Sequence, residues 1–441
     1  MIAVQGLTWT STWVAAPGAT PAGARRVARR PESRDGVVVR VLVASVALLP
    51  LVPMVRVFVG PVPLYLTDAL LVALAAVILR PNRLERRERR LLGVGAACLA
   101  ATVPSLVIAL VAGDEPAFTL YYYGRRVLAL ASFATFLALF AGPPARRRLA
   151  VGALMAGTLV AGVWCVGQVL TRSTGAVGAV DHVYYDRLFQ AGREVAVDRW
   201  AAAWKTPRAI AGWWNANVAG AALALGLAIV AGAGAGRLTV ATLGVAWVGL
   251  FATASRQALL GAALVTGVLA FERGTRRGRL LATVGVGLVL TVLLAGDQLA
   301  RVSGFVEGGL DEGFASRWNN YPDFADALAA STPFTFVFGR GAESWTAVSR
   351  AGVALDSSGF VSNALLLTLA ENGLVGLVGF VTLLVTVARH TTRRWQRGAV
   401  VLVVWLLNCD NHLYLSPGLI AIMAIVLALA AAPAGPRLVS A

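Results

Sequence analysis

Charged residues, cysteines and histidines are all scarce in this chain. Only 14% of its 441 residues are Asp, Glu, Lys or Arg, while 58% are hydrophobic at a mean hydropathy of +0.72. This composition excludes an ordinary soluble domain. The three cysteines and three histidines show no metal-ligand spacing and no disulfide framework. The sequence therefore predicts neither a metal site nor a cofactor.

Several catalytic signatures are absent as well. There is no nucleophile elbow and no glycine-rich phosphate loop ending in Lys-Ser/Thr, and Lys205 is the sole lysine. Residues 1–36 are rich in Pro, Ala, Gly and Arg and lack the apolar stretch of a signal peptide. We predict that they form a disordered, basic cytoplasmic tail.

What the chain has is a series of long apolar runs, each near the ~20 residues that a helix needs to cross a bilayer. The runs are continuous and do not alternate, which excludes an outer-membrane barrel. We expect an all-α membrane protein, a polytopic bundle of about twelve transmembrane helices within residues 37–432, followed by a short cytoplasmic tail at 433–441. The expected spans lie near 39–55, 64–79, 91–112, 126–141, 149–171, 209–233, 238–253, 257–271, 280–296, 361–387, 399–410 and 413–432.

The net charge of +17 would fit a nucleic-acid partner, but the distribution of the basic residues along the chain argues against that partner. Basic residues gather at the N-terminal tail and in every second gap between spans, and the other gaps are balanced. This is the positive-inside pattern of a bacterial inner (cytoplasmic) membrane protein with both termini in the cytoplasm. A minor share of the charge would serve membrane lipid headgroups. The clusters are Arg25 to Arg34, Arg80 to Arg90, Arg146 to Arg148, Arg273 to Arg279 and Arg389 to Arg397.

Two connections on the opposite, extracytoplasmic side are long: residues 172–208 and residues 297–360, the latter between spans nine and ten. Loops of such length are usually functional or disordered. The apolar spacing from Arg317 to Ala330 predicts an amphipathic helix in the second loop. Because this side has no ATP or nucleotide sugars, a reaction there needs a substrate that is already activated.

Three arginines lie at predicted outer helix ends: Arg208, Arg256 and Arg317. A guanidinium offers five donors in a fixed fork, which suits a diphosphate. The alternative is that these side chains reach out to lipid headgroups. Because the positive-inside rule disfavours arginine on the outer face, we favour diphosphate binding as the role of these three residues.

Polar residues within the spans give further candidates. Asn215 and Asn217 lie inside the sixth span, where they either bind substrate or link helices. Asp68 lies one turn inside span two, and Glu371 lies in span ten. For Glu371, catalysis and a hydrogen bond to a neighbouring helix both remain open. Asp356, close to the outer mouth, is either a cap or a general base.

Four sequence pieces in the order seen here resemble those of the O-antigen ligase and O-antigen (Wzy-type) polymerase superfamily, over roughly residues 200–385. The resemblance lies in their order and their spacing around the long outer loop. The pieces are Arg208 to Asn217; Ser255-Arg256; Arg317-Trp318 leading to Pro333 and Gly339-Arg340-Gly341; and Ser362-Asn363 with Leu365, Leu369, Glu371, Gly373 and Gly376.

The resemblance implies a GT-C-like membrane glycosyltransferase that uses a polyprenyl-diphosphate-linked glycan at the outer leaflet, without metal or nucleotide. Arg208 and Arg256 would hold the diphosphate, where charge develops on departure. The acceptor glycan needs a base, for which Asp356 and Glu343 are the candidates beside Glu371. The expected binding set comprises Arg208, Arg256, Arg317, Asn215, Asn217, Asn363 and Lys205.

Three functions remain open. Ligases of this superfamily often have a histidine before the asparagine of the last motif, where this chain has Ser362, which favours a polymerase. A polymerase predicts that its loss accumulates single lipid-linked repeat units, whereas a ligase predicts finished polymer left on its carrier. A lipid-linked glycan transporter would need charged residues through the bundle centre, and it is disfavoured because the deep parts of the spans are mostly Ala, Leu, Val and Gly. Other polysaccharide export proteins are expected partners of each.

Overall fold

The computed structural model describes two units, Met1–Val38 and Val39–Ala441, and the account below concerns the second. The described residues are 34–47, 56–59, 62–79, 85–112, 116–142, 144–171, 216–233, 237–253, 255–273, 328–341, 363–409 and 417–432, with positions 209, 211, 213, 322 and 324–326.

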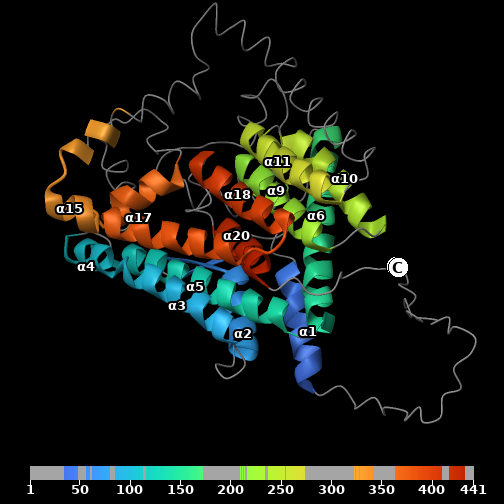
Figure 1. The fold of residues 1–441 in the computed structure, drawn as a ribbon, viewed down its shortest axis with the longest axis horizontal. Coiled ribbons are helices and arrows are strands. Elements are labelled where there is room, and N and C mark those ends of the chain that lie inside the picture. The colour runs from blue at the N-terminus through green and yellow to red at the C-terminus, as the bar shows by residue number, and fades with distance from the viewer. Residues whose placement is uncertain are drawn as a thin grey trace, which may run out of the picture. The chain divides into compact units, whose positions relative to one another are not determined.

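Helices dominate the described residues (Figure 1). In chain order they are α1 (Arg34–Ala47), α2 (Leu66–Ile78), α3 (Arg86–Ala100), α4 (Val103–Ala112), α5 (Pro116–Ala141), α6 (Pro144–Thr171), α9 (Ala216–Ala233), α10 (Arg237–Thr253), α11 (Arg256–Arg273), α15 (Pro333–Phe338), α17 (Ala364–His390), α18 (Arg394–Cys409) and α20 (Pro417–Ala431).

A short antiparallel hairpin precedes α2 and departs from the all-helical prediction. Its strands, β1 (Arg56–Val59) and β2 (Val62–Tyr65), pair Arg56 with Tyr65 and Val59 with Val62. The predicted first span therefore differs from the structure, where α1 ends at Ala47 and a strand follows at Arg56. Apolar, β-branched residues fit a strand as well as a buried helix, so hydropathy alone does not separate the two.

Among the described residues, four helices are long and apolar enough to cross a membrane: Arg86–Val111, Thr119–Ala141, Pro144–Thr171 and Ala364–His390. The first of these comprises α3 and α4, which a turn at Ala101–Thr102 separates. Shorter apolar helices, of 10 to 17 residues, occur at Gly36–Ser45, Leu66–Ile78, Ala216–Val230, Thr239–Thr253, Arg256–Val268 and Leu419–Ala431. A helical membrane protein is thus confirmed, and the count of twelve spans stays a prediction.

The packing falls into two groups joined by the C-terminal helices. In the first group α17 packs along α3 and α4, and α5 packs on α2, α3 and α4 (Figure 1). In the second, α9 contacts α6, α10 and α11. Helix α18 contacts α9, α11 and α17, and α20 contacts α5, α9 and α17. Residues 218–230 of α9 are all buried, so this apolar helix forms the centre of its group.

Candidate active site

Helix α17 is broken at Gly373, and this break organises the polar residues around it. Gly373 has φ +67° and ψ −174°, outside the helical region. The two side chains that precede it, Glu371 and Asn372, are 2% and 1% exposed. A helix interrupted in this way leaves backbone carbonyls of the preceding turn available to other donors.

The segment Gly339–Gly341 supplies donors to these carbonyls. The backbone N–H of Arg340 donates to the carbonyl of Ala370 at 3.1 Å, and that of Gly341 donates to the carbonyl of Glu371 at 3.1 Å. Gly339 has φ +87°, and a Cβ there would lie 2.1 Å from the Glu371 carbonyl oxygen. Two of the motifs singled out in the sequence therefore meet backbone to backbone, and glycine is what permits their approach.

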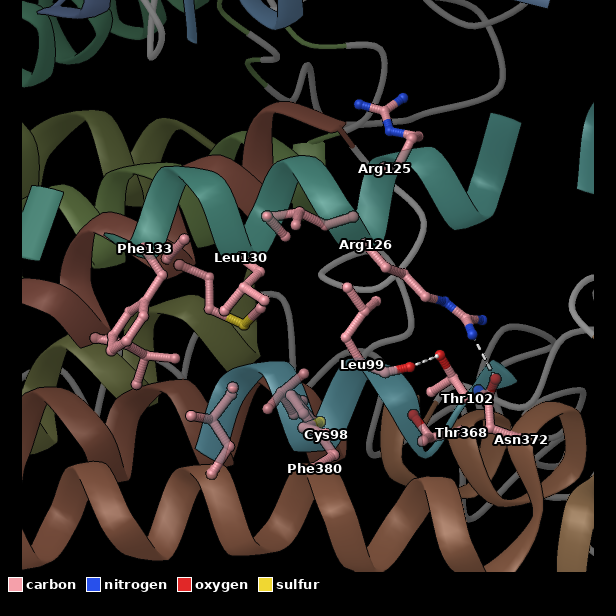
Figure 2. Close-up of a pocket in the computed structure, with 18 of the residues that line it drawn as sticks. Cys98, Leu99, Thr102, Arg125, Arg126, Leu130, Phe133, Thr368, Asn372 and Phe380 are labelled. Carbon is pink, nitrogen blue, oxygen red and sulfur yellow. Dashed lines mark hydrogen bonds between the residues drawn. The ribbon is translucent and has the colours of Figure 1, made fainter. Parts of the chain in front are cut away.

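Arg126 of α5 binds the side chains of the two residues that precede the break. Its Nη2 lies 3.3 Å from Oε2 of Glu371, and its Nη1 donates to Oδ1 of Asn372. Figure 2 shows Arg126 reaching down from α5 to Asn372. A third helix also contributes, because Ser105 Oγ of α4 donates to the Glu371 carbonyl at 2.6 Å. Glu371 is thus part of a helix-linking network, one of the two roles predicted for it.

A cavity of about 160 Å³ lies beneath this network, between α3, α5, α17, α18 and α20 (Figure 2). Most of its lining is hydrocarbon, and its polar lining comes from Thr102, Tyr122, Arg125, Arg126, Thr368, Glu371 and Asn372. Apolar members of the lining include Leu99, Leu130, Phe133, Phe380, Met423 and Leu427.

Arg125, the neighbour of Arg126, points to the opposite side of α5 (Figure 2). Its Nη2 lies 3.4 Å from Oδ1 of Asp68, and its guanidinium lies 5.0 Å from the ring centre of Tyr65 and 5.2 Å from that of Tyr121. Each of the two consecutive arginines therefore pairs with a carboxylate from a different helix, Asp68 on α2 and Glu371 on α17.

Asn363 caps the start of α17. Its Oδ1 accepts the backbone N–H groups of Leu365 at 2.9 Å and Leu366 at 3.0 Å. Its Nδ2 donates to Oδ1 of Asn408, near the end of α18, at 3.4 Å. The asparagine of the last motif therefore has a clear structural function, as an N-cap that also links two helices.

The Ser255-Arg256 turn lies between α10 and α11, close to the backbone that leads into α9. Arg256 is exposed at the first position of α11. The N–H of Ala209 donates to the carbonyl of Ala252 at 2.9 Å, which brings the position after Arg208 to the end of α10. Gly220 of α9 packs against Ser255, where a Cβ on the glycine would lie 2.6 Å from the serine Cβ.

Gln168 of α6 holds the backbone of Ala211, which precedes α9, and no motif in the sequence indicated this residue. It is 6% exposed, accepts the N–H of Ala211 at 2.8 Å and donates to the Ala211 carbonyl at 3.1 Å. Ala211 has φ +46°, an uncommon conformation for a residue other than glycine. Both backbone groups of this strained residue are thereby satisfied.

Of the predicted site residues, Arg256, Asn217, Asn363 and Glu371 lie within the described parts of the chain. Asn217 is half-buried in the first turn of α9. Helices α9, α11 and α17, which carry these four residues, all pack against α18. Lys205, Arg208, Asn215, Arg317, Glu343 and Asp356 lie outside the described residues, and their roles stay predictions.

Sequence reasoning missed Arg125, Arg126, Asn372 and Gln168. The predicted span begins at 126, whereas α5 begins at Pro116 and carries both arginines in its interior. A signal was present, because intramembrane carboxylates need partners and both Asp68 and Glu371 had been identified as such. Nothing in a single sequence indicated which cation would pair with which acid.

Four apolar helices of membrane-crossing length among the described residues, with Arg126 and Glu371 paired between two of them, are typical of a polytopic membrane protein. Within it, residues 241–381 match the family model described as O-Antigen ligase. The matched stretch includes the Ser255-Arg256 turn, Gly339–Gly341 and Glu371. This match supports the resemblance to the O-antigen ligase and polymerase superfamily over the matched stretch. A search of the curated proteins gave no match. Among the described residues, no group of three or more His, Cys, Asp or Glu could hold a metal ion.

Proposed function

We propose that the chain is a bacterial cell-surface polysaccharide polymerase. It transfers a polyprenyl-diphosphate-linked glycan to an acceptor glycan at the outer leaflet of the inner membrane. The observation that supports this most is the position of the superfamily motifs. Gly339–Gly341 contacts the break in α17, and the Ser255-Arg256 turn contacts α9, all within or beside the matched stretch.

Arginines rather than a metal ion stabilise the leaving group in this proposal. As the glycan leaves the carrier, negative charge concentrates on the diphosphate oxygens, and positioned cationic donors stabilise that charge. Arg256 is exposed at the start of α11. The backbone one residue after Arg208 is hydrogen-bonded to the end of α10, four residues before Arg256. This proximity supports joint binding of one diphosphate by the two arginines.

The acceptor hydroxyl loses its proton to a carboxylate. Asp356 and Glu343 of the large loop remain the proposed bases. Glu371 is the weaker candidate for this step, because its carboxylate is 2% exposed and ion-paired with Arg126. A buried carboxylate that already binds a guanidinium is poorly placed to accept a proton from a glycan.

The test is glycan transfer by the purified protein in liposomes, with a polyprenyl-diphosphate-linked repeat unit as substrate. We expect Arg208→Ala and Arg256→Ala to lower the rate by about 10²–10³-fold each, the usual loss for one positioned donor. Lysine should restore little, because a point charge does not replace a bidentate fork.

Arg394→Ala is the matched control for Arg256→Ala. Arg394 is also an exposed arginine at the first position of a helix, α18, but on the side predicted to face the cytoplasm. It should retain activity. Near-normal polymer from either outer arginine variant, at equal protein abundance, would remove the diphosphate clamp from the mechanism.

Transfer of finished glycan to a lipid or protein acceptor is the second candidate. The description of the matching family model, O-Antigen ligase, favours it, and Ser362 before Asn363 disfavours it. The product separates the two reactions, since a polymerase lengthens the carrier-linked chain and a ligase releases the carrier from a finished one.

A further inference from the structure

The break in α17 acts as a receiving site for another part of the chain. Three donors from outside the helix reach the carbonyls of Ala370 and Glu371: two backbone N–H groups of the Gly339–Gly341 segment and the hydroxyl of Ser105. The place at which the large loop returns to the bundle is therefore set by the geometry of the break.

One guanidinium holds the two side chains that precede the break. Arg126 contacts Oε2 of Glu371 and Oδ1 of Asn372, consecutive residues whose side chains are almost wholly buried. Consecutive residues of a regular helix project about 100° apart, so their side chains do not share a partner easily. Binding both from α5 fixes how this turn of α17 is oriented.

We propose that Arg126 is a positioning residue for the large loop. By binding Glu371 and Asn372 together, it maintains the break in α17 on which Gly339–Gly341 rests, and so determines where the loop meets the bundle. The anchoring follows from these contacts alone. Its importance for glycan transfer rests on the proposed function, in which the loop supplies the base.

Arg125 provides a matched control within the same helix. Like Arg126, it is a mostly buried arginine with one carboxylate partner. Its partner is Asp68 of α2, at 3.4 Å, whereas Arg126 lies 3.3 Å from Glu371 of α17. Loss of either arginine leaves one acid without its ion-pair partner and costs stability. Only loss of Arg126 should release the loop.

Accessibility of a cysteine at position 105 measures the anchoring without requiring activity. Ser105 is 0% exposed and touches the break directly. Cys98, Cys165 and Cys409 are first replaced by alanine, and Ser105→Cys is then introduced. The rate at which the new cysteine reacts with a water-soluble maleimide is measured. Ala329→Cys, at an exposed position, reports equal delivery of the reagent in every variant.

We expect Arg126→Gln to raise the labelling rate at position 105 by about tenfold or more, because loss of a hydrogen bond to a charged group shifts a local opening equilibrium by about that factor. Arg126→Lys should give an intermediate rate, since an ammonium does not reproduce the fork that spans both acceptors. Arg125→Gln should leave the rate unchanged. Equal rates in all three variants, or the same rise with Arg125→Gln, would overturn the proposal.

Product formation by the same variants tests whether the anchoring of the loop matters for glycan transfer. Arg126→Gln should lose polymer while Arg125→Gln, at equal abundance, keeps it. Faster labelling with undiminished polymer would establish the anchor but contradict its role in positioning the reaction. If the chain makes no polymer under any condition, the labelling result still decides whether Arg126 anchors the loop.

Discussion

At the scale of single residues, the main finding is that the intramembrane charges come in pairs. Asp68 with Arg125, and Glu371 with Arg126, each join α5 to a different helix. An isolated charge in a membrane helix is costly, and pairing is the usual solution. Such pairs contribute more to the specificity of the arrangement than to stability, because desolvation offsets much of the attraction.

Replacing Glu371 alone should therefore lower the stability of the protein more than replacing both members of the pair. Glu371→Leu leaves Arg126 buried without its carboxylate and should destabilise the protein by about 3–5 kcal/mol, whereas Arg126→Leu with Glu371→Leu should cost much less. Thermal unfolding in detergent measures the difference. If Glu371 were instead the catalytic base, Glu371→Gln would lose activity at unchanged stability.

Gly339 gives a second prediction at this scale. Gly339→Ala places a methyl group against the Glu371 carbonyl at a backbone angle that alanine rarely adopts, so we expect loss of product and reduced stability. The control is Gly93→Ala in α3, where nothing lies within 4 Å of the added Cβ. That change should stabilise the helix by up to about 1 kcal/mol. Equal behaviour of the two variants in activity and melting assays would contradict the contact.

Which residues matter could be predicted in part from the sequence, and which residues they touch could not. Glu371, Asn363 and Gly339–Gly341 were identified from motif order and from polarity inside apolar runs. Glu371 is separated from its partners Arg126 and Ser105 by 245 and 266 positions in the chain, and Asn363 from Asn408 by 45. Pairing over such distances depends on tertiary packing, of which one sequence carries no record.

At the scale of elements, hydropathy located the helices well and their ends poorly. The predicted span 238–253 corresponds to α10 (Arg237–Thr253), and 64–79 corresponds to α2. Helix α5, however, begins ten residues before the predicted start at 126, since α5 starts at Pro116. An arginine whose charge is paired can lie within a span, as Arg125 and Arg126 do in α5.

The connection between α6 and α9 yields a prediction for this scale. Gln168→Leu removes both hydrogen bonds to the backbone of Ala211, and unsatisfied buried groups cost about 1–3 kcal/mol each. We expect lower thermal stability and lower transferase activity, because Ala211 lies just after the predicted binding residue Arg208. Thr171→Ala, an exposed position on the same helix, should change neither. A fully active, fully stable Gln168→Leu protein would show that this link is dispensable.

At the scale of the whole molecule, two of the basic clusters gather at one end of the helices. Arg87, at the start of α3, donates to the carbonyls of His390 and Ala431, at the ends of α17 and α20. The described residues 85–90 and the cluster Arg389–Arg397 are thus neighbours, which fits their assignment to a single side of the membrane. Which side that is remains a prediction of the positive-inside rule.

Reporter fusions test that orientation. Fusions within residues 80–90 and 389–397 should report the cytoplasm, and a fusion within residues 297–360 should report the opposite side. Placement of the 297–360 region in the cytoplasm would contradict the outer-leaflet reaction, since the arginine clamp and the proposed bases would then be on the wrong side.

The most direct test of the central claim is the identity of the lipid-linked glycan that accumulates when the protein is absent. We predict single repeat units on the polyprenyl carrier at the outer leaflet, because their joining is the missing step. Finished polymer on the carrier would contradict a polymerase and favour a ligase. Repeat units held at the cytoplasmic leaflet would contradict both and favour a transporter.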